Sequence, residues 1–240
     1  MVHEILVRKL ISQTKIPIAR YVVNPYIGCG HGCKYCYAQF IGPFKNMNGI
    51  WGRDVYVKLN AVEVFERELY RTRGTILFSS VCDPYQPVER KYQITRKLLE
   101  IALNHYRTVH VLTKSSLVLR DLDILKNKAV SVTITITTDD DRVRKVLEPG
   151  ASSIEERIET VKKLKEAGVD VSVFAGPILP MNPEKLAGKL AKFVDKISFD
   201  RMNYPWFVEQ IYRKYGWSEW LIEDKVSEVV EVFRKFFDVE

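Results

Sequence analysis

Three of the four cysteines in this chain, Cys29, Cys33 and Cys36, lie within eight residues with the spacing Cys-x3-Cys-x2-Cys. Three thiolates on one short loop can bind three irons of a cubic [4Fe–4S] cluster, whereas full ligation of that cluster takes four cysteines. The fourth iron then has an open position, and open metal sites bind substrates or cofactors. Glycines at 28, 30 and 32 let the chain wrap closely around such a group. We define residues 24–37 as the cysteine loop, because the rest of the chain must fold around it.

Two other uses of these cysteines have to be weighed. Cys29, His31, Cys33 and Cys36 together make a Cys3His set for zinc. Structural zinc sites usually take ligand pairs from separated segments, and His31 lies only two residues from its nearest cysteines. A disulfide is the other alternative, but clustered cysteines in a reducing compartment more often bind metal. The spacing favours an iron–sulfur cluster over both.

Length and composition indicate a globular protein with a sizeable core, since 46% of the 240 residues are hydrophobic and 28% are charged. No linker is visible, so we predict one domain over residues 1–240, with a core at about 19–201 and a C-terminal aromatic segment and helix at 203–240. No apolar run is long enough to span a bilayer and no signal peptide is recognisable, which predicts a cytoplasmic protein with no membrane partner. The net charge of +7 is compatible with a nucleic-acid partner but does not require one.

Strand and helix patterns alternate six times along the chain. Apolar, β-branched runs predict strands at 19–23, 74–79, 109–114, 130–137, 169–175 and 196–200. Amphipathic patterns predict helices at 61–71, 95–104, 117–126, 153–167, 183–194 and 218–237, with a further helix beginning near Cys36. The alternation predicts an α/β fold with helices covering a parallel sheet. An open barrel and a flat doubly wound sheet both fit it, and both place the chemistry at the carboxyl ends of the strands.

The cysteine spacing, with Tyr35 before the last cysteine, resembles the Cys-x3-Cys-x-aromatic-Cys signature of the radical S-adenosylmethionine (SAM) superfamily. Asn24-Pro25-Tyr26 and Tyr37-Ala38, on either side, are similar to the spore photoproduct lyase-like branch, often labelled DNA repair photolyase. The resemblance implies a partial (β/α)6 barrel of the TIM type and a [4Fe–4S] cluster whose open iron chelates SAM. It also implies reductive cleavage of SAM to a 5′-deoxyadenosyl radical that abstracts hydrogen, with electrons from a reductant such as flavodoxin or ferredoxin.

The same resemblance implies which residues bind SAM. Cys82-Asp83-Pro84-Tyr85-Gln86-Pro87 is similar to a string in which the Asp lies near the SAM amine, and Thr113-Lys114-Ser115 to one in which the Lys meets the SAM carboxylate. A carboxylate can accept a charge-assisted bond from an ammonium, and a lysine at a strand end is a point cation for a carboxylate. The alternatives are that Asp83-Pro84 only starts a turn and that Lys114 is only solvated.

Three further residues complete the set of SAM-binding residues that the resemblance implies. Tyr35 occupies the aromatic position of the signature, and Thr135 stands where the branch has a serine that bonds SAM. Arg157 either reaches SAM or forms an ordinary ion pair with Glu148.

Cys82 is the fourth cysteine and follows the second predicted strand. A thiol close to a radical can donate a hydrogen atom to a product radical, which makes Cys82 a candidate catalytic residue. In authentic spore photoproduct lyases the donor cysteine lies two residues earlier, where this chain has Ser80, so position alone does not assign the role. A buried, inert cysteine that only packs is the alternative that we favour.

Seven aromatic residues lie between Asn203 and Trp220, interleaved with Arg213 and Lys214. They suit either a base-stacking platform for nucleic acid or a cover for the open edge of an incomplete barrel. The sequence leaves three classes of function. They are radical chemistry on a nucleic-acid base, radical chemistry on a peptide or small molecule, and nucleic-acid binding by a non-enzymatic iron–sulfur or zinc protein.

Overall fold

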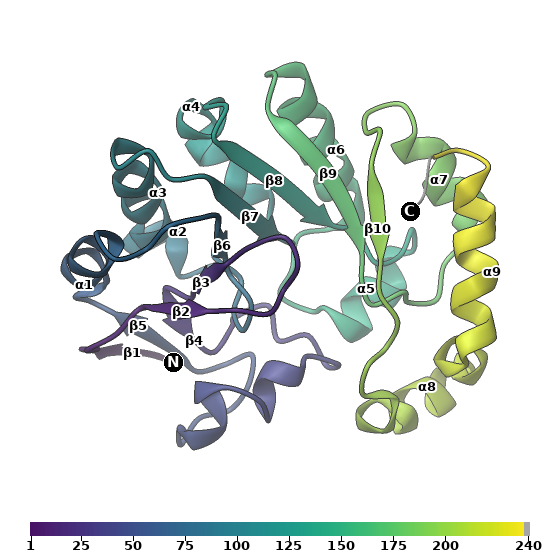
Figure 1. The fold of residues 1–240 in the computed structure, drawn as a ribbon. Coiled ribbons are helices and arrows are strands. Elements are labelled where there is room, and N and C mark those ends of the chain that lie inside the picture. Colours follow the sequence, from purple (N-terminus) through teal and green to yellow (C-terminus); the bar gives the residue numbers. More distant parts are fainter. Residues whose placement is uncertain (238–240) are drawn as a thin grey trace.

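Two β-sheets form the framework of the protein, whose computed structural model describes residues 1–237 (Figure 1). The larger sheet has seven strands. In spatial order they are β10 (Ile197–Phe199), β9 (Asp170–Ala175), β8 (Val130–Thr135), β7 (Val109–Thr113), β6 (Ile76–Phe78), β3 (Tyr21–Val23) and β2 (Ile11–Gln13). All neighbouring pairs are parallel except β2–β3, which is antiparallel.

The order of the six parallel strands distinguishes the two predicted architectures. The six parallel strands are β3, β6, β7, β8, β9 and β10. Each of them lies in the sheet beside the parallel strand that precedes it in the chain. A doubly wound sheet reverses its strand order at a switch point, and this sheet has no such point. Repeated right-handed crossovers in one direction instead curl the sheet into part of a barrel. The barrel is open among the described residues, because β10 pairs only with β9. The predicted partial (β/α)6 barrel is confirmed, and the doubly wound alternative is wrong.

The helices of the described residues are α1 (Ala61–Leu69), α2 (Glu89–Tyr92), α3 (Ile94–Asn104), α4 (Leu122–Leu125), α5 (Asp141–Leu147), α6 (Ile154–Glu166), α7 (Pro183–Leu190), α8 (Glu209–Tyr215) and α9 (Glu223–Arg234). Most of them cover the convex side of the larger sheet (Figure 1), whereas α5 and α8 pack beside Cys33 and Tyr35 of the cysteine loop. The capping box of Ser153 and Glu156 starts α6, and Gly168, with φ of +78°, follows its end. Helix α9 packs on α7 at the β10 side of the barrel (Figure 1).

The smaller sheet was not predicted from the sequence. It consists of β1 (Val2–Ile5), β5 (Val55–Lys58) and β4 (Tyr26–Ile27), in that order. The strand β1 lies before the first predicted strand at 19–23, and β5 lies between that strand and the predicted helix at 61–71, where no element was predicted. Both sheets share one hydrophobic core, in which Val57 of β5 and Val23 of β3 are fully buried.

Some local predictions were wrong. The helix expected near Cys36 is only a 3-10 turn at Tyr37–Gln39, and the helix expected at 117–126 is a 3-10 helix at Ser116–Asp121 followed by the short α4. The helices α2, α5 and α8 were not predicted, because they have only four, seven and seven residues. Among residues 1–237, no helix combines the length and the apolar character needed to cross a membrane.

Candidate active site

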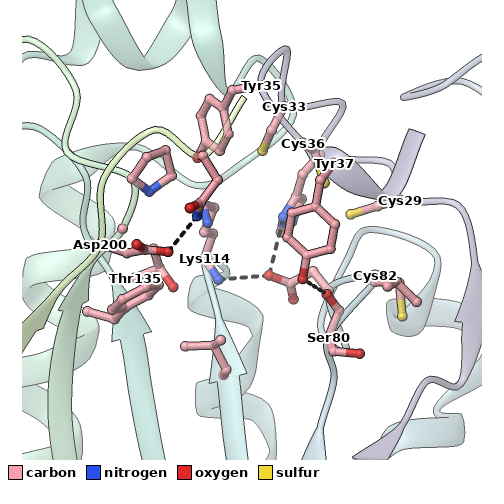
Figure 2. Close-up of a pocket in the computed structure, with 18 of the residues that line it drawn as sticks. Cys29, Cys33, Tyr35, Cys36, Tyr37, Ser80, Cys82, Lys114, Thr135 and Asp200 are labelled. Carbon is pink, nitrogen blue, oxygen red and sulfur yellow. Dashed lines mark hydrogen bonds and ion pairs between the residues drawn. The ribbon is translucent and has the colours of Figure 1, made fainter. Parts of the chain in front are cut away.

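A cavity opens at the carboxyl ends of the parallel strands (Figure 2). Its walls come from the cysteine loop, from the ends of β6, β7, β8 and β9, and from residues 200–204 after β10. Eight of the nine predicted site residues line it, namely Cys29, Cys33, Tyr35, Cys36, Cys82, Asp83, Lys114 and Thr135. The ninth, Arg157, lies outside the lining.

The three cysteines of the loop form one end of the cavity, and their sulfurs point into it (Figure 2). Cys29 and Cys33 are buried and Cys36 is partly exposed, and all three are free thiols. Burial is the largest cause that raises the pKa of each thiol. Since metals bind thiolates, cluster assembly on this loop must release protons.

Close backbone contacts hold the cysteine loop in place. A Cβ atom added at Gly32 would lie 3.0 Å from Cα of Gly52, and one added at Gly150 would lie 2.3 Å from the carbonyl oxygen of Gly30. The indole N–H of Trp51 also donates to the carbonyl of Cys33 at 3.2 Å. These contacts restrict the conformation of the loop, and supporting contacts of this kind orient the ligands of a metal site.

His31 bonds away from the sulfurs. Its Nδ1 lies 3.4 Å from Oδ2 of Asp83, and its ring is almost fully buried. Among residues 1–237, no three His, Cys, Asp or Glu side chains converge closely enough to ligate a single metal ion. Each thiolate of a cubic cluster binds a different iron, so its three cysteines need not converge on one point. The three cysteines therefore fit a cluster better than the Cys3His zinc alternative, in which all ligands bind one ion.

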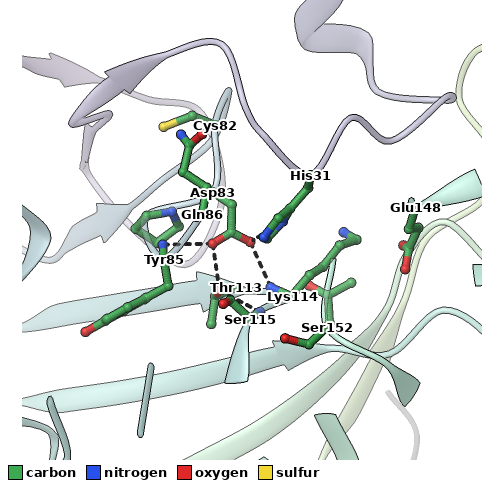
Figure 3. Close-up of polar contacts among 12 residues, drawn as sticks. His31, Cys82, Asp83, Tyr85, Gln86, Thr113, Lys114, Ser115, Glu148 and Ser152 are labelled. Atoms are coloured by element: carbon green, nitrogen blue, oxygen red, sulfur yellow. Dashed lines mark hydrogen bonds and ion pairs between the residues drawn. The ribbon is translucent and has the colours of Figure 1, made fainter. Parts of the chain in front are cut away.

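Asp83 is a hub that joins the cysteine loop to two strands (Figure 3). Oδ1 accepts from the hydroxyl of Thr113 at 2.7 Å and from the backbone N–H of Tyr85 at 2.9 Å. Oδ2 accepts from the backbone N–H of Lys114 at 2.8 Å and faces His31. Burial alone would raise the pKa of Asp83, but His31 and these donors lower it to about 2. The carboxylate is thus ionised and already has four partners. It therefore holds its neighbours in position and also places a negative charge beside the cavity.

Lys114 contributes a cation to the cavity. Among the described residues its Nζ has no hydrogen-bond or ion-pair partner, and it lies 5.9 Å from the centre of the Tyr35 ring. A buried or half-buried ammonium without a partner is costly, so an anionic ligand would be favoured there. Thr135, at the end of β8, lines the same cavity and is 2% exposed.

Behind Thr135 lies a fully buried ionic network that the sequence only partly indicated. Arg157 pairs with Glu148 at 2.5 Å, without linear hydrogen-bond geometry, and also donates to the carbonyl of Thr135 at 3.1 Å. Glu148 accepts in addition from the hydroxyls of Tyr35 and, at 3.0 Å, Thr137. Arg157 therefore forms the ion pair that was one of its two predicted roles, and it supports Tyr35 from outside the cavity.

Cys82 lies at the side of the cavity, apart from the three sulfurs of the cysteine loop (Figure 2). Its sulfur is 2.9 Å from the hydroxyl of Ser79, and the side chain packs against the main core. Burial raises the pKa of this thiol to about 11. The residue is held as a neutral thiol that lines the cavity and also packs against the main core.

Several residues that shape the cavity were not predicted to belong to the site. Asn24 organises the turn after β6, because its Oδ1 accepts from the hydroxyl of Ser79 at 2.8 Å and from the N–H groups of Ser80 and Val81, each at 2.9 Å. Residues 200–204, which follow β10, close the other side of the cavity. The sequence could have indicated these residues, because they follow a predicted strand and the residues after the other parallel strands also contribute to the site.

Comparison with known proteins places this geometry in a family. The Radical SAM superfamily matches residues 23–194. An uncharacterized protein of Methanocaldococcus jannaschii is 34% identical over 98% of this chain and 90% of its own length. A spore photoproduct lyase of Clostridium acetobutylicum is 29% identical over 71% of this chain and 50% of the lyase. The chain thus spans about half the length of that lyase.

A solved structure shares the fold. It is a spore photoproduct lyase variant with bound AdoMet and dinucleoside spore photoproduct, which matches with a TM-score of 0.69 and 18% identity. The match covers 98% of this chain and 77% of that one.

The chain belongs to the radical SAM superfamily and is an enzyme of that class, which uses a [4Fe–4S] cluster and SAM. Within the superfamily its fold is that of spore photoproduct lyase. The superfamily, the enzyme class and the two cofactors implied by the sequence are confirmed.

Proposed function

We propose that this enzyme abstracts hydrogen from a nucleic-acid base, with Cys29, Cys33 and Cys36 as cluster ligands. The observation that supports it is the gathering of these thiols, the Asp83 hub and Lys114 around one cavity. The bound cluster and SAM supply a 5′-deoxyadenosyl radical once an electron arrives from a reductant such as flavodoxin or ferredoxin. The nucleic-acid substrate class is supported by the relative and the solved structure named spore photoproduct lyase.

The residues of the chain prepare the cavity for this chemistry. The buried cysteine loop excludes water from one end, which protects a reactive radical from side reactions. Lys114 offers its ammonium to the SAM carboxylate, while Asp83, already bonded to four partners, fixes the backbone of Lys114 and adds negative charge for the SAM amine. Thr135 presents a hydroxyl, and Tyr35, braced by Glu148, presents its ring. Cys82 is kept as a packing residue beside the cavity.

Replacing Lys114 by alanine should weaken SAM binding and leave the cluster in place. Loss of a charge-assisted contact costs about 1.5–3 kcal/mol, which is roughly a 10- to 150-fold weaker Kd. The measurement is equilibrium dialysis of SAM against anaerobically reconstituted protein, with iron content determined on the same samples. Lys34→Ala is the control, because Lys34 is also a lysine beside the cysteines but does not line the cavity. Equal SAM affinity in Lys114→Ala and the wild type would contradict the assignment.

Transfer of deuterium tests the substrate class directly. Oligonucleotides with deuterated bases, supplied with SAM and a chemical reductant, should yield 5′-deoxyadenosine that carries deuterium, and its formation should rise above the level without oligonucleotide. Mass spectrometry of the 5′-deoxyadenosine measures both effects. If cleavage of SAM proceeds but no deuterated base ever labels the product, the substrate is of another class.

A further inference from the structure

The aromatic segment after β10 divides into two parts with different surroundings. Tyr212 is fully buried, and Trp217 and Trp220 pack with it against a small core that includes Cys33 and Tyr35. These rings therefore cover the cysteine loop, which neither of the two sequence-based alternatives named. Tyr204 and Trp206 do not join them, because Tyr204 lines the cavity and Trp206 is 63% exposed.

Tyr204 and Trp206 meet a third ring from across the cavity mouth. The centre of the Phe40 ring lies 5.0 Å from that of Tyr204, with the planes nearly perpendicular, and 5.6 Å from that of Trp206. Phe40 directly follows the turn at Tyr37–Gln39, whereas Tyr204 and Trp206 follow β10. The three rings therefore connect the cysteine-loop side of the cavity to the β10 side. We call Phe40, Tyr204 and Trp206 the aromatic rim. The three neighbouring rings, with Trp206 63% exposed, form an apolar patch, and exposed apolar patches often mark contacts with ligands or partners.

The segment that carries Phe40 has charge of one sign only. Residues 5–53 contain no Asp or Glu and hold seven basic residues: Arg8, Lys9, Lys15, Arg20, Lys34, Lys45 and Arg53. Lys34 and Lys45 flank Phe40 in sequence, and both are exposed. Neither has an ion-pair partner among residues 1–237. The side chain of Gln39 donates to the carbonyl of Lys34 at 3.3 Å, which keeps Lys34 next to the turn that precedes Phe40.

On the other side of the rim two glutamates are paired with arginines, whereas Asp200, which lines the cavity, has no ion-pair partner among residues 1–237. Glu223 pairs with Arg201 at 2.6 Å and Glu209 pairs with Arg213 at 2.6 Å. On the Phe40 side of the rim the unpaired charges are therefore the cations of Lys34 and Lys45, and the carboxylate of Asp200 lies on the β10 side. Exposed aromatic faces next to unpaired cations are what single-stranded nucleic acid needs, because bases stack on the rings and phosphates meet the cations.

We propose that the aromatic rim stacks an unpaired base of single-stranded nucleic acid, with Lys34 and Lys45 meeting the adjoining phosphates. This rests on the proposed function, in which the cavity acts on a base. A base inside a duplex is stacked on both faces and cannot reach a cavity unless it leaves the helix. The rim therefore selects single-stranded or extruded bases over intact duplex.

The test is fluorescence anisotropy of a labelled oligothymidylate and of the corresponding duplex with reconstituted enzyme, without SAM. The single strand should bind more tightly than the duplex. Trp206→Ala should weaken single-strand binding about 5- to 150-fold, since stacking contributes about 1–3 kcal/mol per base. Trp206→Phe should keep most of the affinity, and Tyr106→Ala, at a ring 94% exposed outside the cavity lining, should keep all of it. Lys34→Glu with Lys45→Glu should flatten the dependence of affinity on salt by roughly 1 unit of slope or more.

Three results would overturn the inference. They are equal or tighter binding of duplex, an unchanged single-strand affinity in Trp206→Ala, and an unchanged salt slope in the lysine variant. If the lysine variant leaves the salt slope unchanged but slows reduction of the cluster by a protein electron donor, Lys34 and Lys45 bind that donor and not nucleic acid. If the wild type transfers deuterium but Trp206→Ala binds the single strand normally, the role of the aromatic rim is refuted and the proposed reaction stands. If the rim binds the single strand as expected but no deuterium is transferred, the proposed reaction is refuted and the role of the rim stands.

Discussion

Cys33→Ala is expected to lose most of its iron after anaerobic reconstitution and to form 5′-deoxyadenosine only at background level. Cys33 supplies one of only three protein thiolates at the cavity end, so no other described cysteine can replace it there without moving the loop. Contacts such as Gly32 against Gly52 hold that loop in one conformation. Iron and sulfide content, the visible absorption spectrum and SAM cleavage measure the loss.

Cys82→Ala is the matched control for this variant. It makes the same chemical change at a cysteine that lines the cavity but packs against the main core. It should retain the cluster and cleave SAM. A wild-type protein that takes up stoichiometric zinc and no iron under the same anaerobic conditions would contradict the cluster assignment, as would a full cluster in Cys33→Ala.

The sequence predicted the barrel strands well because their signal is local. Each of the six parallel strands is a short apolar run followed by a helix pattern, and the order of the sheet follows the order of the chain. The smaller sheet has no such signal. Its strand β5 pairs with β1, more than fifty positions earlier, and β4 has only two residues, Tyr26 and Ile27. Pairings of this kind depend on the completed fold.

The candidate site shows the same division. The cysteines, Asp83, Lys114 and Thr135 belong to strand ends or to a recognisable motif, and they do line one cavity. Their supporting contacts were beyond the sequence, since nothing in its pattern says that His31 faces Asp83 or that Asn24 accepts three bonds from the turn after β6. The sequence also did not indicate the role proposed for Trp206. Trp206 is exposed and Tyr212 is buried, and nothing in the sequence pattern distinguishes the two.

Arg157→Leu is expected to lower the free energy of unfolding by about 3–5 kcal/mol, because it leaves the carboxylate of Glu148 buried without its cation. Both side chains are 0% exposed in the wild type. Chemical denaturation at neutral pH measures the loss. Arg213→Leu breaks the ion pair with Glu209, whose side chains are 71% and 49% exposed, and should change stability little.

The dependence on pH separates this ionic role from simple packing. Burial alone would raise the pKa of Glu148, but Arg157, Lys114 and the Tyr35 hydroxyl lower it below its usual value of 4.5. A carboxyl with a lowered pKa stabilises the fold above its unfolded pKa, and this contribution is lost as pH falls through the folded pKa. In Arg157→Leu the cation is gone and burial raises the pKa, so acidification from neutral pH should first restore stability to the variant.

The wild type and Arg157→Leu should therefore differ most at neutral pH and converge in mild acid. Adding Glu148→Gln to Arg157→Leu removes the buried charge and keeps an acceptor for the hydroxyls of Tyr35 and Thr137. That double variant should recover part of the lost stability and show no acid rescue. A difference between Arg157→Leu and the wild type that stays constant over this pH range would mean that Arg157 acts by filling space. In that case Tyr35, between Cys33 and Cys36, is braced by packing and not by the charge on Glu148.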